Sequence, residues 1–176
     1  MIFVRHCQSS GQAPDAPLTP QGAADARALT DRLLQLGIDA VYSSPYLRAV
    51  QTIEPFAAKH ALPINIEFDM RERRLSAEPL DDWLDHIRQS FANLDHRAPG
   101  GETLREAQSR GLAALQRIHM QRPACAVVAS HGNLLASLLH RMDPSFGFEA
   151  WQTMPNPALY RVALTAGVPT SFEVLV

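Results

Sequence analysis

The sequence predicts an α/β fold: a three-layer sandwich in which helices flank a mostly parallel central sheet. Short apolar runs that resemble strands alternate along the chain with segments of helical periodicity. The most apolar run, residues 124–129, leads directly into a helix-like segment, as parallel strands with right-handed crossovers require. A length of 176 residues suits one domain, so we expect residues 1–176 to form a single domain.

The first elements are a strand, a loop and a helix. Residues 2–4 are apolar and predict a buried strand, and a polar loop with proline and glycine follows. Thr19 is a candidate N-cap and Pro20 suits the first helical position. Apolar residues then recur at helical spacing until Gly37, a typical end of a helix. A short strand is expected over 38–42.

The next elements repeat this order. Residues 43–45 (Ser-Ser-Pro) predict another helix start, and Arg48 falls in the first turn of that helix. Apolar residues at helical spacing continue behind it. Residues 63–68 suggest a third strand, after which the chain reaches Glu72.

The middle of the chain is less regular, and its end returns to strands. A helix is expected over 80–94 with Trp83 on its apolar face, and a second helix over 102–121. After the strand at 124–129 and the helix behind it, two further strands are expected at 159–164 and 172–176. The turn between these last two is assigned to Gly-Val-Pro at 167–169.

Composition and charge exclude several classes of protein. The net charge is −2, so there is no basic surface to favour nucleic acid or an anionic membrane. No apolar run is long enough to cross a bilayer, and the first residues are too few and too interrupted for a signal peptide. Two cysteines, Cys7 and Cys125, cannot build a disulfide framework or a zinc site. We therefore expect a cytoplasmic protein without nucleic-acid or membrane partners, as a monomer or homodimer.

Charged residues follow the ends of separate predicted strands. In a parallel sheet the carboxyl ends of the strands meet at one edge, where ligands bind. The residues delivered to this edge are Arg5, His6, Arg48, Glu72 and His131. The sequence therefore predicts one charged pocket rather than five unrelated surface residues.

The chemistry of this set suits a phosphate dianion. Arginine offers a planar fork of donors that matches phosphate oxygens, and helix N-termini add backbone N–H groups. A histidine with one unprotonated nitrogen, such as His6, is a competent nucleophile, and neighbouring cations disfavour its protonation. Glu72 is then the natural proton donor to a leaving oxygen.

Each of these residues also has a structural explanation when it is taken singly. A histidine at a strand end is commonly a hydrogen-bonded structural side chain, and Glu72 lies within a charged Arg-Glu-Arg-Arg run that is typical of an exposed turn. Arg48 alone suits a solvated first turn, although a cation there opposes the helix dipole. Their joint placement favours the pocket.

Five segments of the chain also resemble a known family. They are VRHCQS, SSPYLRAVQT, MRER, GGET and ASHGN, in this order. Their order and spacing are similar to those of the histidine phosphatase, or phosphoglycerate mutase-like, superfamily, from Met1 to about Leu164. SSPYLRAVQT is the most specific match, whereas GGET is weak alone.

The resemblance implies phosphoryl transfer through a phosphohistidine, with no metal and no cofactor. His6 would be the nucleophile, Arg5, Arg48 and His131 would hold the phosphoryl oxygens, and Glu72 would be the acid and then the base. The expected substrate-binding set is Ser9, Gln12, Arg73, Gly132 and Asn133. The fold implied is phosphoglycerate mutase-like, in agreement with the fold predicted above.

Two features depart from the usual pattern of this family. Cys7 stands where glycine usually follows the nucleophilic histidine, and we interpret it as a small residue that fits. A cysteine nucleophile would need a Cys-x5-Arg phosphate loop, and position 13 is alanine. Residues 73–101 lack the family's Gly-x-Trp-Glu-Gly run, and a lid segment is expected within this range. The arginines at 71, 73 and 74 could meet a second anionic group or lie in solvent.

Among the activities of this family, we favour a phosphomonoesterase acting on small phosphorylated metabolites. Only residues 73–101 are available to close the site, so water should reach it. The Glu72-Arg73 pair resembles the mutases, so a phosphoglycerate mutase-type transfer stays an alternative. A non-catalytic module that binds phosphorylated ligands is a third possibility, which would not need Glu72. A metallohydrolase is disfavoured, because His6 and His131 lack partners at metal-ligand spacing.

Overall fold

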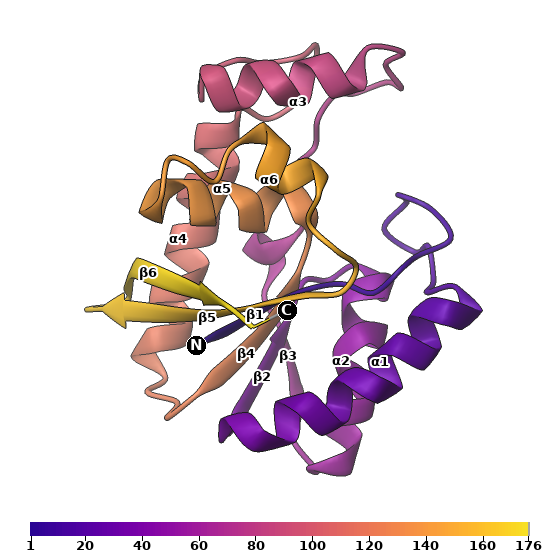
Figure 1. Ribbon diagram of the computed structural model, residues 1–176, viewed down its shortest axis with the longest axis vertical. Helices are drawn as coiled ribbons and strands as arrows, with labels where there is room; N and C mark the ends of the chain where they lie inside the picture. The colour runs from indigo at the N-terminus through magenta and orange to yellow at the C-terminus, as the bar shows by residue number, and fades with distance from the viewer. Residues whose placement is uncertain (176) are drawn as a thin grey trace.

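The computed structural model describes residues 1–175, which form a three-layer α/β structure around one six-stranded sheet (Figure 1). The strand order is β3-β2-β4-β1-β5-β6. The first four strands of the chain run parallel, and β5 and β6 are antiparallel to their neighbours. The strands are β1 (Ile2–Arg5), β2 (Ala40–Ser43), β3 (Ile64–Ile66), β4 (Ala126–Ser130), β5 (Ala158–Thr165) and β6 (Val168–Val174). The predicted fold class, with its mostly parallel sheet, is confirmed.

Helices cover both faces of the sheet. They are α1 (Pro20–Leu33), α2 (Leu47–Lys59), α3 (Trp83–Ala92), α4 (Leu104–Met120), α5 (Gly132–Met142) and α6 (Phe148–Gln152), with short 3₁₀ turns η1 (Leu34–Leu36) and η2 (Phe68–Met70). Figure 1 shows α1 and α2 on one side of the sheet and α4 and α5 on the other, with α3 beyond α6. Among residues 1–175, no helix has the length and apolar character to span a membrane.

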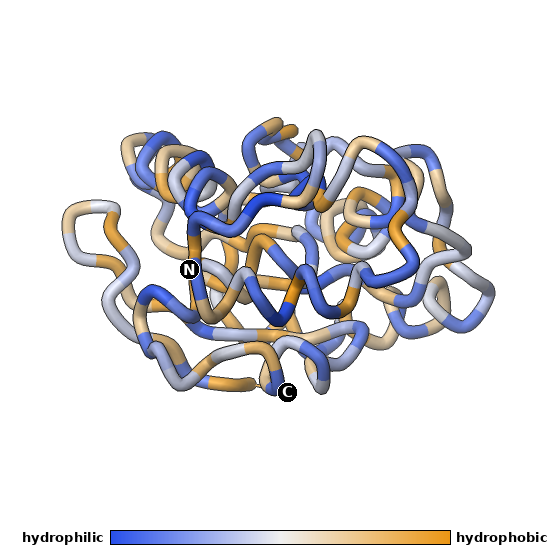
Figure 2. The backbone as a smooth tube through the Cα atoms, turned by 90° about the horizontal axis from the view of Figure 1, so that it is seen from above, coloured by the Kyte–Doolittle hydropathy of each residue, from blue (hydrophilic) through white to orange (hydrophobic). Residues whose placement is uncertain are grey.

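The core divides into two layers because the central strands are covered on both faces. On β4 every residue is buried, and alternate side chains join different layers: Val128 packs with α4 and α5, and Val127 and Ala129 pack with α1 and α2. A strand buried on both faces has a continuous apolar sequence, as residues 124–129 have. In Figure 2 the hydropathy alternates along the helices, as expected when each buries one side.

The parallel strands bring their carboxyl ends to the same level. In the sheet, Arg5 pairs with Ser130 and Ser43 pairs with Ala129. The chain continues the ladder for one residue after each strand, since His6 N–H donates to Ser130 O at 2.9 Å and Ser44 N–H donates to Ala129 O at 2.9 Å. The residues that follow β1, β2 and β4 therefore start from one edge of the sheet.

The ends of α1 match the sequence signals. Thr19 caps the helix by accepting the Gly22 N–H at 3.0 Å, and Pro20 is its first residue. Gly37 ends the following 3₁₀ turn with φ of 64°, a left-handed conformation that costs glycine little. These features confirm the boundaries expected for this helix.

Two helix boundaries differ from the prediction. Helix α2 begins at Leu47, after residues 43–45, because Ser43 and Ser44 use their hydroxyls elsewhere: Ser43 donates to Ser44 O, and Ser44 pairs with His131. Helix α3 covers 83–92 rather than 80–94, and Trp83 at its start is 48% exposed rather than on the buried face.

The end of the chain also differs. Helix α6 was not predicted, because five residues are too few to show helical periodicity. Strand β6 starts at Val168, so the turn consists of Ala166 and Gly167, both with positive φ (49° and 79°). Two such residues form a tight hairpin turn, and Pro169 is tolerated in β6 because this strand lies at the edge of the sheet. The last residue of the predicted strand, Val176, lies outside the described residues.

Helix α4 begins with a complete capping box, which gives a test of the fold. Thr103 accepts the Glu106 N–H at 3.0 Å, and the Glu106 carboxylate accepts the Thr103 N–H at 2.9 Å. Thr103→Ala should lower the free energy of unfolding by about 1 kcal/mol, measured by urea denaturation, because it removes an N-cap. Ser109→Ala, at an exposed position in the same helix, is the control and should change stability much less.

Candidate active site

The structure brings the five predicted pocket residues together at the carboxyl edge of the sheet. Arg5 ends β1 and His6 follows it, Arg48 lies in the first turn of α2, and His131 is the N-cap residue of α5. Glu72 comes after η2 and contacts the start of α5. Their geometry decides what this pocket can do.

His6 is held by hydrogen bonds at both ring nitrogens. Nδ1 lies 2.7 Å from Cys7 O, and Arg48 Nε donates to Nε2 at 3.2 Å. Since a carbonyl can only accept and a guanidinium can only donate, the proton of the ring is placed on Nδ1 and the lone pair on Nε2. Burial lowers the pKa of His6 to about 4, and the charges of Arg48 and Arg5 act in the same direction. The ring is therefore neutral at pH 7.

Arg48 is almost completely buried although it carries a charge. Besides its bond to His6, it donates from Nη1 to Gln12 O at 3.2 Å and Ala13 O at 2.9 Å. Its guanidinium carbon lies 5.0 Å from the centre of the Tyr46 ring. Arg48 thus connects the nucleophile candidate to the loop after β1. Burial lowers its pKa, and the Glu72 carboxylate partly offsets this effect.

Arg5 packs against the start of α5. One of its nitrogens, Nη1, donates to Met154 O, and its buried Nε has no partner within residues 1–175. A methyl group on Gly132 would lie 3.2 Å from Arg5 Nε and 3.3 Å from Trp151 Nε1. Glycine at position 132 therefore lets this guanidinium lie directly beside the helix N-terminus.

His131 is fully buried and neutral. Its Nε2 pairs with Ser44 Oγ at 2.7 Å, and its Nδ1 has no partner in the described part of the chain. Ser44 Oγ accepts the Tyr46 N–H at 3.2 Å and can donate its own proton to Nε2, and in that arrangement Nδ1 carries the ring proton and is a donor. Burial lowers the pKa of His131 well below its usual value, and the nearby charge of Arg48 adds to this. The rings of His6 and His131 meet edge to face, with centroids 5.2 Å apart.

Glu72 is held by backbone N–H groups rather than by an arginine side chain. Its carboxylate accepts from the N–H groups of Arg73 (2.9 Å), Asn133 (3.2 Å) and Leu134 (3.1 Å). The last two belong to the first turn of α5, where the helix dipole favours a negative charge. Glu72 is partly exposed and close enough to Arg5 and Arg48 to affect both pKa values.

Together these groups form a pocket of donors with one carboxylate beside it. Two guanidiniums and the Nδ1 of His131 can face an anion with several oxygens, and the positive end of the α5 dipole favours its charge. His6 Nε2 offers a lone pair to the central atom of such an anion. This combination suits capture of a phosphoryl group.

The predicted substrate-binding residues are placed less uniformly. Gly132 and Asn133 lie at the site, where the Asn133 N–H binds Glu72 and its side-chain Oδ1 is buried without a partner among residues 1–175. The Gln12 carbonyl accepts a hydrogen bond from Arg48, whereas Gln12 as a whole is exposed. The Ser9 hydroxyl donates to Gly11 O at 3.0 Å within its own loop.

Arg73 binds the chain on the side of α3 and α4. It is buried and donates to Ser90 Oγ at 2.8 Å and to Glu102 O at 3.0 Å, so its guanidinium holds α3 and the start of α4. Its third nitrogen, Nη1, is buried without a partner within residues 1–175, and the role of Arg73 as a substrate contact stays a prediction. The direction of a side chain in an irregular segment cannot be read from its position in the sequence, and the neighbouring Glu72 points the other way.

Cys7 packs in the interior as a small residue. Its side chain is completely buried, and burial raises the pKa of its thiol to about 11, so no thiolate is present at neutral pH. Its N–H donates to Thr52 Oγ1 at 2.9 Å, and Thr52 in turn donates to Arg48 O at 2.7 Å. The backbone of Cys7 therefore orients His6 and connects it to α2.

Several residues that support the site were not predicted to contact it. Asn156 Nδ2 donates to His6 O at 2.8 Å from a loop near the end of the chain. Ser44 and Thr52 support His131 and Arg48, as described above. The segment expected to contain a lid carries α3, whose Trp83 meets Trp151 of α6 edge to face at 6.5 Å.

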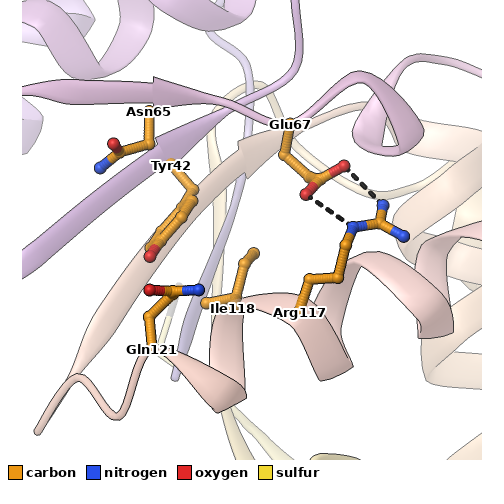
Figure 3. Close-up of a pocket in the computed structure, with 6 residues that line it drawn as sticks. All are labelled: Tyr42, Asn65, Glu67, Arg117, Ile118 and Gln121. Carbon is orange, nitrogen blue, oxygen red and sulfur yellow. Dashed lines mark hydrogen bonds and ion pairs between the residues drawn. The ribbon is translucent and has the colours of Figure 1, made fainter.

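A second hollow lies at a different place on the sheet (Figure 3). It is lined by Tyr42, Asn65, Glu67, Arg117, Ile118 and Gln121. Arg117 binds the Glu67 carboxylate with bonds of 2.7 and 3.2 Å, so the two charges neutralise each other. None of the five pocket residues reaches this hollow, which offers no net charge to a phosphate.

A family model for the histidine phosphatase superfamily (branch 1) matches residues 1–173. The chain therefore belongs to this superfamily, as its motifs predicted. Probable phosphoglycerate mutases GpmB are similar over 86% of this chain and 76% of their own length: that of Salmonella typhi is 29% identical over 167 residues, and that of Shigella dysenteriae serotype 1 is 30% identical over 169.

Solved structures share the fold over the whole chain. A mycobacterial glucosyl-3-phosphoglycerate phosphatase has a TM-score of 0.75 at 19% identity, covering 100% of this chain and 96% of that one. The alpha-ribazole phosphatase of Shigella flexneri has a TM-score of 0.70 at 19% identity, covering 100% and 95%. At this level of identity the likeness concerns the fold alone.

The depressed pKa of His6 predicts how stability depends on pH. The unfolded chain takes up this proton near pH 6.5 and the folded chain only near pH 4, so the contribution of the neutral ring is present above pH 6.5 and is lost as the pH falls towards 4. The free-energy advantage of the wild type over His6→Gln should shrink by about 3 kcal/mol across this range.

Urea denaturation at several pH values, without phosphate, measures this difference. His119→Gln, at an exposed position on α4, is the control and should keep the pH profile of the wild type. A difference between wild type and His6→Gln that stays constant from pH 7 to pH 4 would contradict the buried, neutral state of His6.

Proposed function

We propose that this protein is a phosphomonoesterase that hydrolyses small phosphorylated metabolites through a phosphohistidine on His6. The observation that carries the proposal is the pair of hydrogen bonds at the His6 ring, from Nδ1 to Cys7 O and from Arg48 Nε to Nε2. They support a neutral ring whose Nε2 lone pair is directed into a pocket of cations. A nucleophile in this state needs no separate base to remove a proton.

The first half-reaction transfers the phosphoryl group to His6. Nε2 attacks phosphorus, the bond between phosphorus and the ester oxygen breaks, and Glu72 gives its proton to the leaving oxygen. Arg48 then donates to the phosphoryl oxygens instead of to Nε2. Arg5, the Nδ1 of His131 and the N-terminus of α5 meet the remaining negative charge.

The second half-reaction returns the enzyme to its starting state. The Glu72 carboxylate takes a proton from water, the hydroxide attacks phosphorus, and the bond between phosphorus and Nε2 breaks. Inorganic phosphate leaves, and Glu72 carries the proton for the next cycle. Glu72 lies next to the groups that would hold the phosphoryl oxygens, and this position supports its role as acid and base.

A phosphoglycerate mutase-type transfer is the second candidate, favoured by the similarity to probable phosphoglycerate mutases. The first half-reaction would be the same, but a hydroxyl group would take the phosphoryl group from His6 in place of water. Incubation with 3-phosphoglycerate separates the two: release of inorganic phosphate supports hydrolysis, and formation of 2-phosphoglycerate supports the mutase. Binding without either product would favour a module that only recognises phosphorylated ligands.

We predict that hydrolysis needs no metal ion, because Arg5 and Arg48 would supply the positive charge that a metal supplies elsewhere, and neutral His131 would add a hydrogen-bond donor. Release of p-nitrophenol from p-nitrophenyl phosphate should continue unchanged in EDTA. Vanadate, which adopts a five-coordinate geometry like that of the phosphoryl group in transfer, should inhibit competitively. Activity that disappears in EDTA and returns with a divalent metal would contradict this prediction.

Glu72→Gln should make the covalent intermediate visible. An aryl phosphate leaves as a stabilised anion and needs little protonation, so His6 should still become phosphorylated. Water would lack its base, and the phosphoenzyme should accumulate. Phosphohistidine is labile in acid, so the reaction is quenched in alkali and the adduct is mapped by mass spectrometry.

The matched control is Glu78→Gln, an exposed position in the same segment, which should turn over like the wild type. Phosphate on His6 supports the mechanism. Phosphate on Ser9, Cys7 or His131 would contradict it, and the absence of any adduct would indicate direct attack by water.

A further inference from the structure

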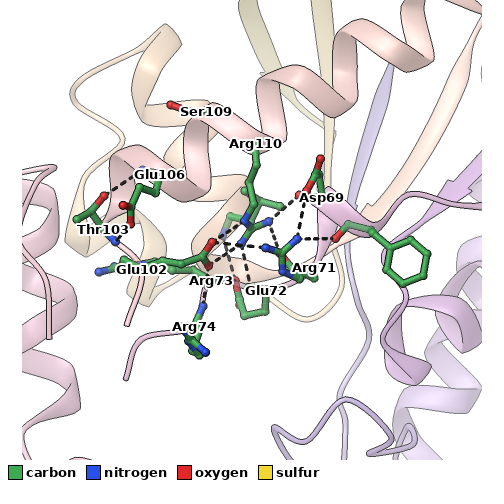
Figure 4. Close-up of polar contacts among 12 residues, drawn as sticks. Asp69, Arg71, Glu72, Arg73, Arg74, Glu102, Thr103, Glu106, Ser109 and Arg110 are labelled. Carbon is green, nitrogen blue, oxygen red and sulfur yellow. Dashed lines mark hydrogen bonds and ion pairs between the residues drawn. The ribbon is translucent and has the colours of Figure 1, made fainter. Parts of the chain in front are cut away.

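Residues 69–74 comprise the end of η2 and the irregular segment that follows it, which carries Glu72. In place of a helix or strand ladder, side chains bind the carbonyls of this segment. Ser130 Oγ donates to Met70 O at 2.7 Å, and Arg110 of α4 donates to the carbonyls of Asp69 (2.6 Å), Arg71 (2.8 Å) and Glu72 (3.2 Å). Two side chains thus fix four consecutive carbonyls, and Figure 4 shows the contacts that Arg110 makes with this segment.

Arg110 uses every donor that it has. Its two remaining N–H groups bind the two carboxylate oxygens of Glu102, at 2.8 and 2.9 Å. A guanidinium has five N–H donors, and all five are engaged here. Arg110 therefore has no donor left for a substrate, although it binds the backbone of Glu72, whose side chain faces the pocket.

Glu102 binds the backbone of Arg74, two residues after Glu72 in the sequence. Its carboxylate accepts the Arg74 N–H at 3.0 Å, and its own N–H donates to Arg74 O at 2.7 Å. Burial raises the pKa of Glu102, but the hydrogen bonds and charge of Arg110 outweigh this and leave the pKa below its usual value. The pair stays ionised with side chains only 11% and 18% exposed.

We propose that Arg110 is a positioning residue for Glu72: by binding the carbonyls at 69, 71 and 72, it sets where the Glu72 carboxylate meets the leaving oxygen. This inference rests on the proposed function, in which Glu72 is the proton donor. The Glu72 carboxylate itself is bound by N–H groups of α5, so the backbone is held from one side and the carboxylate from the other. Without Arg110, the carbonyls at 69, 71 and 72 lose these hydrogen bonds, while the bonds to the Glu72 carboxylate remain.

A positioning role predicts a selective loss. Proton donation matters for an alkyl phosphate, whose leaving alkoxide is a strong base, and matters little for an aryl phosphate. A displaced carboxylate should therefore reduce kcat for alkyl substrates while the phosphorylation of His6 by aryl substrates continues. A role confined to the stability of the fold would not separate the two kinds of substrate.

The test uses Arg110→Lys, which keeps the charge but cannot reproduce the fork of five donors. We expect kcat for an alkyl phosphate such as glycerol 3-phosphate to fall about 10- to 100-fold, as displacements of about 1 Å do. Single-turnover phosphorylation by p-nitrophenyl phosphate should stay within about threefold of the wild type, since it depends little on the acid. Equal losses for both substrates would overturn the proposal.

The matched control is Arg105→Lys on the same helix. Within residues 1–175 the exposed side chain of Arg105 binds Asp95 alone, at 2.7 and 3.1 Å, so both rates should match those of the wild type. If Arg110→Lys fails to fold, Glu102→Gln keeps Arg110 and weakens its orientation. It should show the same selective loss on a smaller scale, and equal losses for both substrates would again overturn the proposal.

Combination with Glu72→Gln separates this inference from the proposed function. If Arg110 acts through Glu72, Arg110→Lys should reduce alkyl hydrolysis much less in the Glu72→Gln background than in the wild type. Full additivity of the two losses would overturn the proposal. If Glu72→Gln alone lowers the rates for alkyl and aryl phosphates by the same factor, Glu72 is not the proton donor. The proposal that Arg110 positions Glu72 for that role then fails as well.

Discussion

The arrangement of the site depends on one chain of hydrogen bonds, from Arg48 Nε through the His6 ring to Cys7 O. A carbonyl on one side and a guanidinium on the other leave only one protonation state that satisfies both partners. Burial enforces the same state by lowering the pKa of His6 to about 4. The buried arginine thus fixes the histidine, and Thr52 fixes both by binding Cys7 N–H and Arg48 O.

The remaining groups of the pocket follow from the register of the sheet. Because β1, β2 and β4 end at the same level, His6, Ser44 and His131 start from one edge, and α5 begins there with its N–H groups free of earlier helical partners. Two of those groups bind Glu72, while Arg5 Nε and His131 Nδ1 are buried without partners within residues 1–175. Buried donors without partners cost free energy, so an anion that accepts their hydrogen bonds would be stabilised at this edge. The superfamily assignment and the geometry point to the same class of chemistry.

Sequence patterns identified this site through local helix signals and through the common edge of parallel strands. Thr19, Pro20 and Gly37 mark a helix by its local backbone needs, and Arg5, His6, Arg48 and His131 were found because strand ends share an edge. Arg73 and Arg110 show where such rules stop. Both lie near Glu72 in sequence or space, yet the direction of each side chain depends on contacts with α3, α4 and the 69–74 segment that no local pattern encodes. Asn156 reaches His6 from 150 positions away, and α6 is too short to be periodic.

The central claim is the protonation state of His6, and nitrogen NMR measures it directly. In protein labelled with ¹⁵N-histidine at pH 7, a long-range ¹H–¹⁵N correlation spectrum distinguishes the two neutral tautomers from imidazolium, and His6→Gln assigns the signal. The hydrogen bonds described here predict a neutral ring with its proton on Nδ1 and an unprotonated Nε2. A proton on Nε2, or an imidazolium at pH 7, would contradict the account.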